Sequence, residues 1–408
     1  MSQIKKLTLD NGARILLEHH THVQSAAVGL WCRTGSRHET ETEAGITHFI
    51  EHMLFKGTER RTAKQIAESI EGRGGILNAF TDKEQTCYYA RVLSDDVLNA
   101  VDVLSDMLLH SKLDPEEIQR EKGVILEEIK RGEDEPGDHV HELHVSNLWG
   151  DHPLGKPIIG TKESVSGFQR PDFTGYINRR YRGESVVLGI AGNFDVDAVI
   201  ESAKSLLGGL PSGLEEPATS RPQAEGRTNL VSDDVEQVHF CIGGDSVDLY
   251  SEDLYAVAVM DAILGGGMSS RLFQEVRERR GLAYSVGSYN MSYSHGGAFV
   301  IYGGTGQETW PQTQEVIHNE IAKIQTELVP DEEFDRTKRQ MKGTMVLALE
   351  GMNARMSRMV KNEFNHGREI PIEETLAKIE AVSREDVLRV AGQVLNRDRL
   401  TTTAIGRF

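Results

Sequence analysis

Two histidines and a glutamate stand close together in an apolar stretch, in the order His48-Phe49-Ile50-Glu51-His52. On a helix, residues three and four positions apart share one face, with β-carbons about 5–6 Å apart. His48 and His52 can therefore offer two imidazole nitrogens to one metal ion, and Glu51 lies on the same side as a proton acceptor. Two nitrogens, a third ligand and an open position for water make a hydrolytic zinc site.

The alternative is a helix with two solvated histidines. The neighbouring side chains make this helix largely apolar: Ile46, Phe49, Ile50, Met53, Leu54 and Phe55. Histidines in such a helix need polar partners. The order His-x-x-Glu-His is also the inverted form of a known zinc motif, so we favour a metal site.

A third ligand is expected to be a carboxylate on another element. A helix is predicted from Pro115, a residue type favoured at the first helical position, to about residues 131–132. It carries Glu121, Glu127 and Glu128. Glu121 and Glu128 share a face, so one can bind a metal while the other supports the site. Spacing does not choose between Glu127 and Glu128, and a solvated acidic face is the plain alternative.

The elements that must position these residues alternate irregularly. Strands are predicted at 23–34 and 84–93, helices at 44–56 and 95–110, and a hairpin turn at 10–12. Hairpins and helices without a regular βαβ rhythm indicate an α+β fold.

The chain also contains the pattern of a duplication. Residues 208–233 are rich in turn-forming and polar residues, which is typical of a linker. Three short similarities repeat across this stretch at offsets of 213, 216 and 214 residues. We therefore predict two homologous domains, residues 1–207 and 234–408.

Composition limits the classes of function. The 408 residues carry 63 acidic and 45 basic side chains, for a formal net charge of −18. Such a surface repels phosphate, so we expect no nucleic-acid partner. Three cysteines are too few for a disulfide framework. The N-terminal residues lack the apolar core of a signal peptide, and no apolar run reaches the ~18 residues of a membrane span. We expect a cytoplasmic protein without membrane insertion.

The residues around the histidines form a longer motif. They read Ala44-Gly45-Ile46-Thr47-His48-Phe49-Ile50-Glu51-His52-Met53-Leu54-Phe55-Lys56-Gly57-Thr58. This segment resembles the active-site segment of the pitrilysin/insulinase family of zinc peptidases, above all the subgroup of mitochondrial processing peptidase and its bacterial relatives. The family places its third ligand 76 residues after the second histidine, which implies Glu128. A glutamate seven residues earlier supports the catalytic centre in the family, which implies Glu121.

The resemblance implies the fold as well. It implies two homologous α+β domains, each a mainly antiparallel sheet packed with helices, which together form half of a clamshell. The segment 74–81 resembles the family's substrate-edge strand, where an extended substrate adds as a β-strand. Asn78 and Ala79 would then meet the substrate backbone.

The second half resembles the non-catalytic half of related enzymes. The segment 269–285 is similar to the family's, and its Arg277 and Tyr284 match residues that help to bind substrate. Arg277 could hold a substrate carbonyl and Tyr284 could stabilise the oxyanion; a solvated helix charge and a packed strand residue are the alternatives. At an offset of 216 residues Glu128 falls on Thr344, so we expect no zinc in this domain.

These inferences predict a zinc-dependent endopeptidase for extended or unfolded peptides. One Zn²⁺ per chain is expected on His48, His52 and Glu128, with Glu51 as general base and Glu121 in support. The resemblance implies pairing with another chain, most simply as a homodimer that encloses a chamber. The alternatives are a non-catalytic or partner-dependent subunit of a heterodimeric processing peptidase, and a non-enzymatic zinc-binding protein. The four intact motif residues argue against a non-catalytic scaffold.

Three further histidines lie close together: His139, His141 and His144. They follow a turn at residues 135–137 and are predicted to open a helix on which only His141 and His144 share a face. We expect no second designed metal site there.

Overall fold

The computed structural model describes residues 4–216 and 219–408. It divides into two compact units, each built on one sheet. The described parts of Met1–Ile129, Lys156–Ala218 and Ala348–Glu369 form the first unit, and those of Lys130–Gly155, Thr219–Leu347 and Ile370–Phe408 form the second. Residues 1–3 at the N-terminus and 217–218 in the predicted linker lie outside the described residues.

The sheet of the first unit has six strands in the order β1-β2-β6-β3-β5-β4. The strands are β1 (Lys5–Thr8), β2 (Arg14–His19), β3 (Ser25–Cys32), β4 (Ile76–Thr81), β5 (Thr86–Leu93) and β6 (Val186–Gly192). Only the pair β2 and β6 is parallel; the other neighbours are antiparallel. The predicted turn at 10–12 joins β1 to β2, and β4 forms an edge of the sheet.

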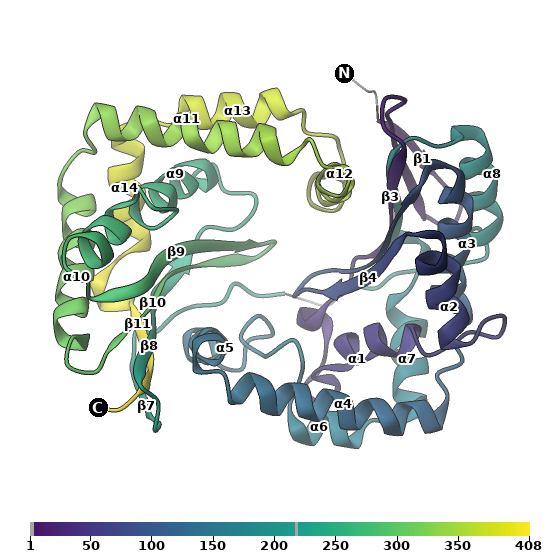
Figure 1. The fold of residues 1–408 in the computed structure, drawn as a ribbon, viewed down its shortest axis with the longest axis horizontal. Helices are drawn as coiled ribbons and strands as arrows, with labels where there is room; N and C mark the ends of the chain where they lie inside the picture. Colours follow the sequence, from purple (N-terminus) through teal and green to yellow (C-terminus); the bar gives the residue numbers. More distant parts are fainter. Residues whose placement is uncertain (1–3, 217–218) are drawn as a thin grey trace. The chain divides into compact units, whose positions relative to one another are not determined.

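Successive side chains of a strand point to opposite faces of a sheet. In this unit both faces are covered by helices. The helices of the unit are α1 (Ile46–Leu54), α2 (Ala63–Ile70), α3 (Val97–His110), α4 (Pro115–Glu133), α6 (Lys162–Gly167), α7 (Arg170–Arg180), α8 (Val196–Leu207) and α12 (Met352–His366). One face packs Ile15, Val28 and Leu30 into the main core beneath α1 and α3. The other face packs Leu16 and Trp31 against α12, which lies on the opposite side from α3 and α8 (Figure 1).

The second unit repeats this plan. Its strand order is β7-β11-β8-β10-β9, with only β7 and β11 parallel. The strands are β7 (Thr228–Ser232), β8 (Gln237–Ser246), β9 (Ala283–Tyr293), β10 (Gly296–Gly306) and β11 (Thr401–Gly406). The helices are α5 (Pro136–Trp149), α9 (Leu254–Leu264), α10 (Trp310–Thr326), α11 (Asp331–Ala348), α13 (Ile372–Ala381) and α14 (Arg384–Val394). This order matches β2-β6-β3-β5-β4 strand for strand, as a duplication requires.

The units differ from the predicted domain ranges because each takes one helix from the other half of the sequence. In the first unit, α12 packs Met356 and Val360 onto the sheet so closely that a Cβ on Gly189 would lie 2.5 Å from Val360 Cγ2. In the second unit, α5 packs against β8 and β11. An amphipathic pattern shows that a helix needs an apolar partner but not which sheet supplies it. The predicted linker was also too long, since it includes β7.

No helix in the described part of the chain is long and apolar enough to cross a membrane.

Candidate metal centre

Helix α1 separates an apolar face from a polar one. Ile46, Phe49, Ile50, Met53 and Leu54 are buried in the main core, whereas His48, Glu51 and His52 are half-buried. The helix begins after Gly45, whose φ of 89° belongs to the left-handed region that favours glycine. A Cβ there would also lie 2.5 Å from the carbonyl oxygen of Ile159, so the backbone approach needs a residue without a side chain.

The ligand atoms of His48, His52 and Glu128 gather at one point between α1 and α4. The Oε2 atom of Glu128 lies 3.9 Å from His48 Nε2 and 3.6 Å from His52 Nε2. Around a tetrahedral zinc ion with bonds of about 2.0–2.1 Å, ligand atoms lie about 3.3–3.5 Å apart. The donor set and its spacing therefore fit zinc after a small contraction. Among the described residues this is the only group of three or more such donors.

Burial and charge keep the first histidine neutral. Burial, together with the neighbouring His52, lowers the pKa of His48 to about 4. Neutral imidazole is the form that binds a metal. The Nε2 atom of His48 is the one that faces Glu128, whereas its Nδ1 atom is buried without a hydrogen-bond partner among the described residues.

The second histidine, His52, contacts a carboxylate through Nδ1, the ring nitrogen that does not face Glu128. His52 Nδ1 lies 3.1 Å from Glu121 Oε2, and the other oxygen of that carboxylate, Oε1, lies 2.6 Å from Lys56 Nζ. A carboxylate accepts, so His52 carries its proton on Nδ1 and leaves the Nε2 lone pair free. Glu121 thus lies where a supporting residue is expected.

Glu51 is held by the end of the edge strand. The hydroxyl of Thr81, the last residue of β4, donates to Glu51 Oε2. Burial raises the pKa of Glu51, an effect that this hydrogen bond opposes. A carboxylate with a raised pKa beside a metal site can accept and return a proton.

The other predicted site residues lie in the edge strand β4 and in the second unit. Asn78 and Ala79 are in β4, where the Ala79 N–H donates to Asn78 Oδ1 at 2.8 Å. Arg277 and Tyr284 are in the second unit and contact each other, with the guanidinium carbon 4.7 Å from the ring centroid. The same guanidinium lies 4.7 Å from the ring of Phe273, and Tyr284 is 78% exposed.

Two of the open sequence alternatives have an answer in the geometry. Glu127 is exposed and does not join the three donors. In the other histidine cluster, His141 Nδ1 lies 2.8 Å from the Tyr289 hydroxyl and His144 Nδ1 lies 3.2 Å from Thr403 Oγ1. These side chains are packing and hydrogen-bonding residues of α5.

Sequence reasoning missed the residue that orients the start of α1. Glu39 is buried, and its two carboxylate oxygens accept from the backbone N–H groups of Gly45 and Thr47, each at 2.8 Å. N–H groups at the start of a helix have no partner within the helix, so these two acceptor oxygens stabilise this end of α1. Thr47 also donates to the Tyr176 hydroxyl at 3.0 Å. Glu39 precedes α1 by too many residues to register as a helix cap.

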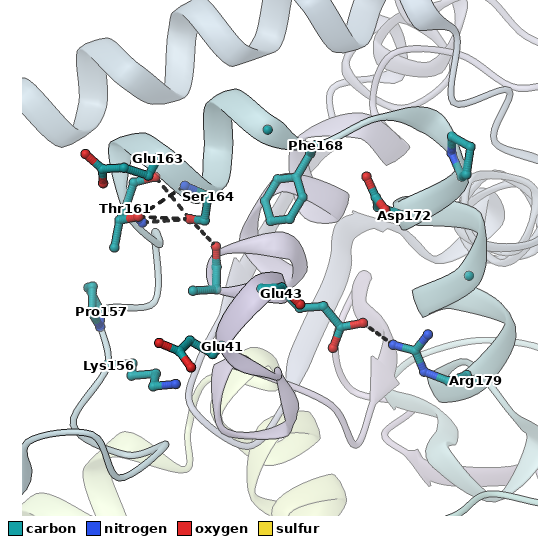
Figure 2. Close-up of a pocket in the computed structure, with 15 residues that line it drawn as sticks. Glu41, Glu43, Lys156, Pro157, Thr161, Glu163, Ser164, Phe168, Asp172 and Arg179 are labelled. Carbon is teal, nitrogen blue, oxygen red and sulfur yellow. Dashed lines mark hydrogen bonds and ion pairs between the residues drawn. The ribbon is translucent and has the colours of Figure 1, made fainter.

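A cavity of about 770 Å³ lies beside this end of α1. Figure 2 shows its polar contacts, in which Ser164 Oγ donates to the Ala44 carbonyl at 2.7 Å and Arg179 pairs with Glu43. None of the predicted site residues lines it. These contacts join the segment before α1 to α6 and α7. The cavity therefore belongs to the part of the structure that supports the start of α1.

Comparison with protein families agrees with this geometry. Residues 14–162 match the model of "Insulinase (Peptidase family M16)" and residues 167–341 match that of "Peptidase M16 inactive domain". The chain is 42% identical to a Bacillus subtilis protein named as the uncharacterized zinc protease YmxG, over 97% of this chain and 96% of the relative. A Streptomyces coelicolor protein, also named as an uncharacterized zinc protease, is 38% identical over 99% of this chain and 89% of its own length.

Two solved structures share the fold. A protease from Helicobacter pylori superimposes with a TM-score of 0.94 at 20% identity, covering 100% of both chains. A structure titled as the peptidase M16 inactive domain from Pseudomonas fluorescens gives a TM-score of 0.92 at 20% identity, covering 100% of this chain and 98% of that one.

Glu39 makes a testable contribution to stability. Burial raises its pKa to about 7, so the folded protein keeps a proton that the unfolded chain releases near pH 4.5. The free energy of unfolding contributed by this group therefore falls as the pH rises from about 4.5 to about 7. Glu39→Gln should destabilise by about 1–3 kcal/mol at pH 5, through one lost acceptor, and by less at pH 7. Chemical unfolding at both pH values measures this, with the exposed Glu41→Gln as control; a difference that does not change with pH would contradict it.

Proposed function

The chain belongs to the insulinase family of zinc peptidases, peptidase family M16, and we propose that it is an active endopeptidase for extended or unfolded peptides, with one zinc ion per chain. The observation that carries the proposal is that Glu128 of α4 meets His48 and His52 at α1, the helix that also carries Glu51. When bound there, zinc supplies a Lewis acid that makes water a nucleophile near neutral pH and polarises a peptide carbonyl.

Glu51 performs the proton transfers. The Thr81 hydroxyl donates a hydrogen bond to the Oε2 atom of Glu51. The carboxylate accepts a proton from the attacking water. The same carboxyl then returns the proton to the leaving amine, which restores the base for the next cycle. The raised pKa of Glu51 supports this role, because a base whose pKa approaches the working pH is also a competent acid.

The edge strand supports the choice of substrate. β4 pairs with β5 on one side only, and its residues Ile76 and Asn78 are exposed. An extended peptide can add to such an edge by main-chain hydrogen bonds, with Asn78 and Ala79 meeting its backbone. A folded protein has no free extended segment to offer, so the substrates are unfolded or short peptides.

The second unit supplies substrate contacts but no metal. The Arg277 guanidinium carbon lies 4.7 Å from the ring centroids of both Phe273 and Tyr284, a distance typical of cation–π contacts. The exposed Tyr284 hydroxyl and the guanidinium are donors suited to a substrate carbonyl and an oxyanion. In a homodimer that encloses a chamber, these two residues serve the zinc site of the other subunit.

The first prediction from the proposed function concerns Glu51. Glu51→Gln keeps the shape of the side chain but not its basicity, so it should retain zinc while kcat falls by about 10²–10⁴-fold. Cleavage of an unstructured peptide and the zinc content of both proteins are measured together. A wild type that holds zinc and never cuts would favour a partner-dependent or non-catalytic subunit. A wild type without metal would refute the zinc site.

The second prediction concerns the hydrogen bond from Thr81. Thr81→Val removes the hydroxyl and keeps the branched shape; losing a hydrogen bond to a charged group, about 1.5–3 kcal/mol, should lower kcat about 10- to 100-fold at unchanged zinc content. Thr81→Ser should restore kcat. The matched control is Ser288→Ala, since Ser288 donates to Asp261 at 2.5 Å in the second unit. Equal losses of kcat in both variants would contradict a specific role of Thr81.

The third prediction concerns the two-subunit site. Glu51→Gln and Arg277→Ala should each abolish most activity as homodimers. A heterodimer of the two variants contains one site with both residues intact if Arg277 acts on the partner's zinc site. Random pairing after co-expression should then recover about one quarter of the wild-type activity. Verified heterodimers without recovered activity would mean that Arg277 acts within its own chain.

A further inference from the structure

The carboxylate of Glu121 is buried deeply for a charged group. Its residue is 4% exposed, and a buried carboxylate is costly unless both oxygens find donors. Oε2 lies 3.1 Å from His52 Nδ1 and Oε1 lies 2.6 Å from Lys56 Nζ. One oxygen therefore faces the metal ligand and the other faces a lysine.

Lys56 reaches this carboxylate from the end of the metal-binding helix. Its backbone N–H donates to the Met53 carbonyl at 3.1 Å, which continues the last turn of α1. Lys56 follows His52 by four residues, so the two side chains leave the same face of that turn. The lysine side chain is 30% exposed, with its head against Glu121. Two neighbouring side chains at the end of α1, those of His52 and Lys56, thus both contact the carboxylate of Glu121 in α4.

We propose that Lys56 is a positioning residue of the zinc site. By holding Oε1, it fixes the rotation of the Glu121 carboxylate, so that Oε2 stays on the Nδ1–H of His52. This fixes the tautomer and the ring angle of His52 and directs its Nε2 lone pair to the metal. The inference rests on the zinc site of the proposed function.

If Lys56 acted only through its charge, its removal would change the zinc affinity in the opposite direction. An ammonium group close to a bound cation repels it, so its removal would then tighten zinc binding. If Lys56 acts by positioning, its removal loosens the support of His52 and weakens binding. The direction of the change in affinity therefore separates the two roles.

The test is zinc affinity, measured on purified protein by competition with a chromophoric chelator. Lys56→Met should weaken zinc binding about 10- to 100-fold, the range typical for residues that orient metal ligands, and Lys56→Arg should restore most of it. Lys64→Met is the matched control, because Lys64 in α2 has a side chain that is 82% exposed and pairs with its helix neighbour Glu68. Thermal unfolding of the metal-free proteins checks folding; if Lys56→Met does not fold, Lys56→Gln replaces it.

A double-mutant cycle tests the route of the effect. If Lys56 acts through Glu121, Lys56→Met should change zinc affinity by less than about twofold in a Glu121→Gln background. Unchanged or tighter zinc binding by the single variant, or a full additional loss in the double variant, would overturn the inference. A wild type that binds no zinc would instead overturn the proposed site itself.

Discussion

The site depends on one constraint, the need of half-buried polar groups on α1 for partners across the contact with α4. The apolar residues of α1 must face the core, and the 3.6-residue period then fixes which way His48, Glu51 and His52 point. Taking imidazoles and carboxylates out of water is unfavourable unless each is paired. Glu121 and Glu128 supply partners for the two histidines from two turns of α4, and Thr81 of β4 supplies the partner for Glu51. Packing and ligand geometry are therefore set by the same contact.

The second unit shows which part of this arrangement belongs to the shared fold. In α9 the carboxylate of Asp261 accepts from Ser288 of β9, as Glu51 of α1 accepts from Thr81 of β4. Burial raises the pKa of Asp261 to about 6, so both units keep a half-buried acid between helix and edge strand. The second unit lacks the histidines, since α9 reads Leu-Tyr-Ala-Val-Ala-Val-Met-Asp-Ala-Ile-Leu. The link from helix to edge strand is thus common to both units, and the imidazoles with their opposing carboxylates give the first one alone a candidate metal site among the described residues.

The sequence predicts best the features that depend on residues close together in the chain. The helix predicted at 44–56 and the strand predicted at 84–93 follow from local sequence patterns, and the structure has them as α1 (Ile46–Leu54) and β5 (Thr86–Leu93). The choice of Glu128 over Glu127 came from the family resemblance, because neighbouring helix positions differ by about 100° and spacing alone does not fix the rotation of α4. The exchange of α5 and α12 depends on contacts between segments that are distant in the sequence. Glu39 lies six residues before Gly45, outside the spacing of a helix cap, so no local pattern identifies its role.

The two histidine clusters show why spacing alone is a weak sign of a metal site. His141 and His144 share a face of α5 as His48 and His52 share a face of α1, but they meet different surroundings. His144 is fully buried, and a Cβ on Gly243 would lie 2.9 Å from its Nε2, so a glycine makes room for a packed ring. Its Nδ1 contacts a hydroxyl, not a carboxylate. A catalytic zinc site needs a third protein ligand beside two histidines, and Glu128 offers one to His48 and His52. The third ligand from α4 therefore distinguishes the histidine pair of α1 from that of α5 as a candidate zinc site.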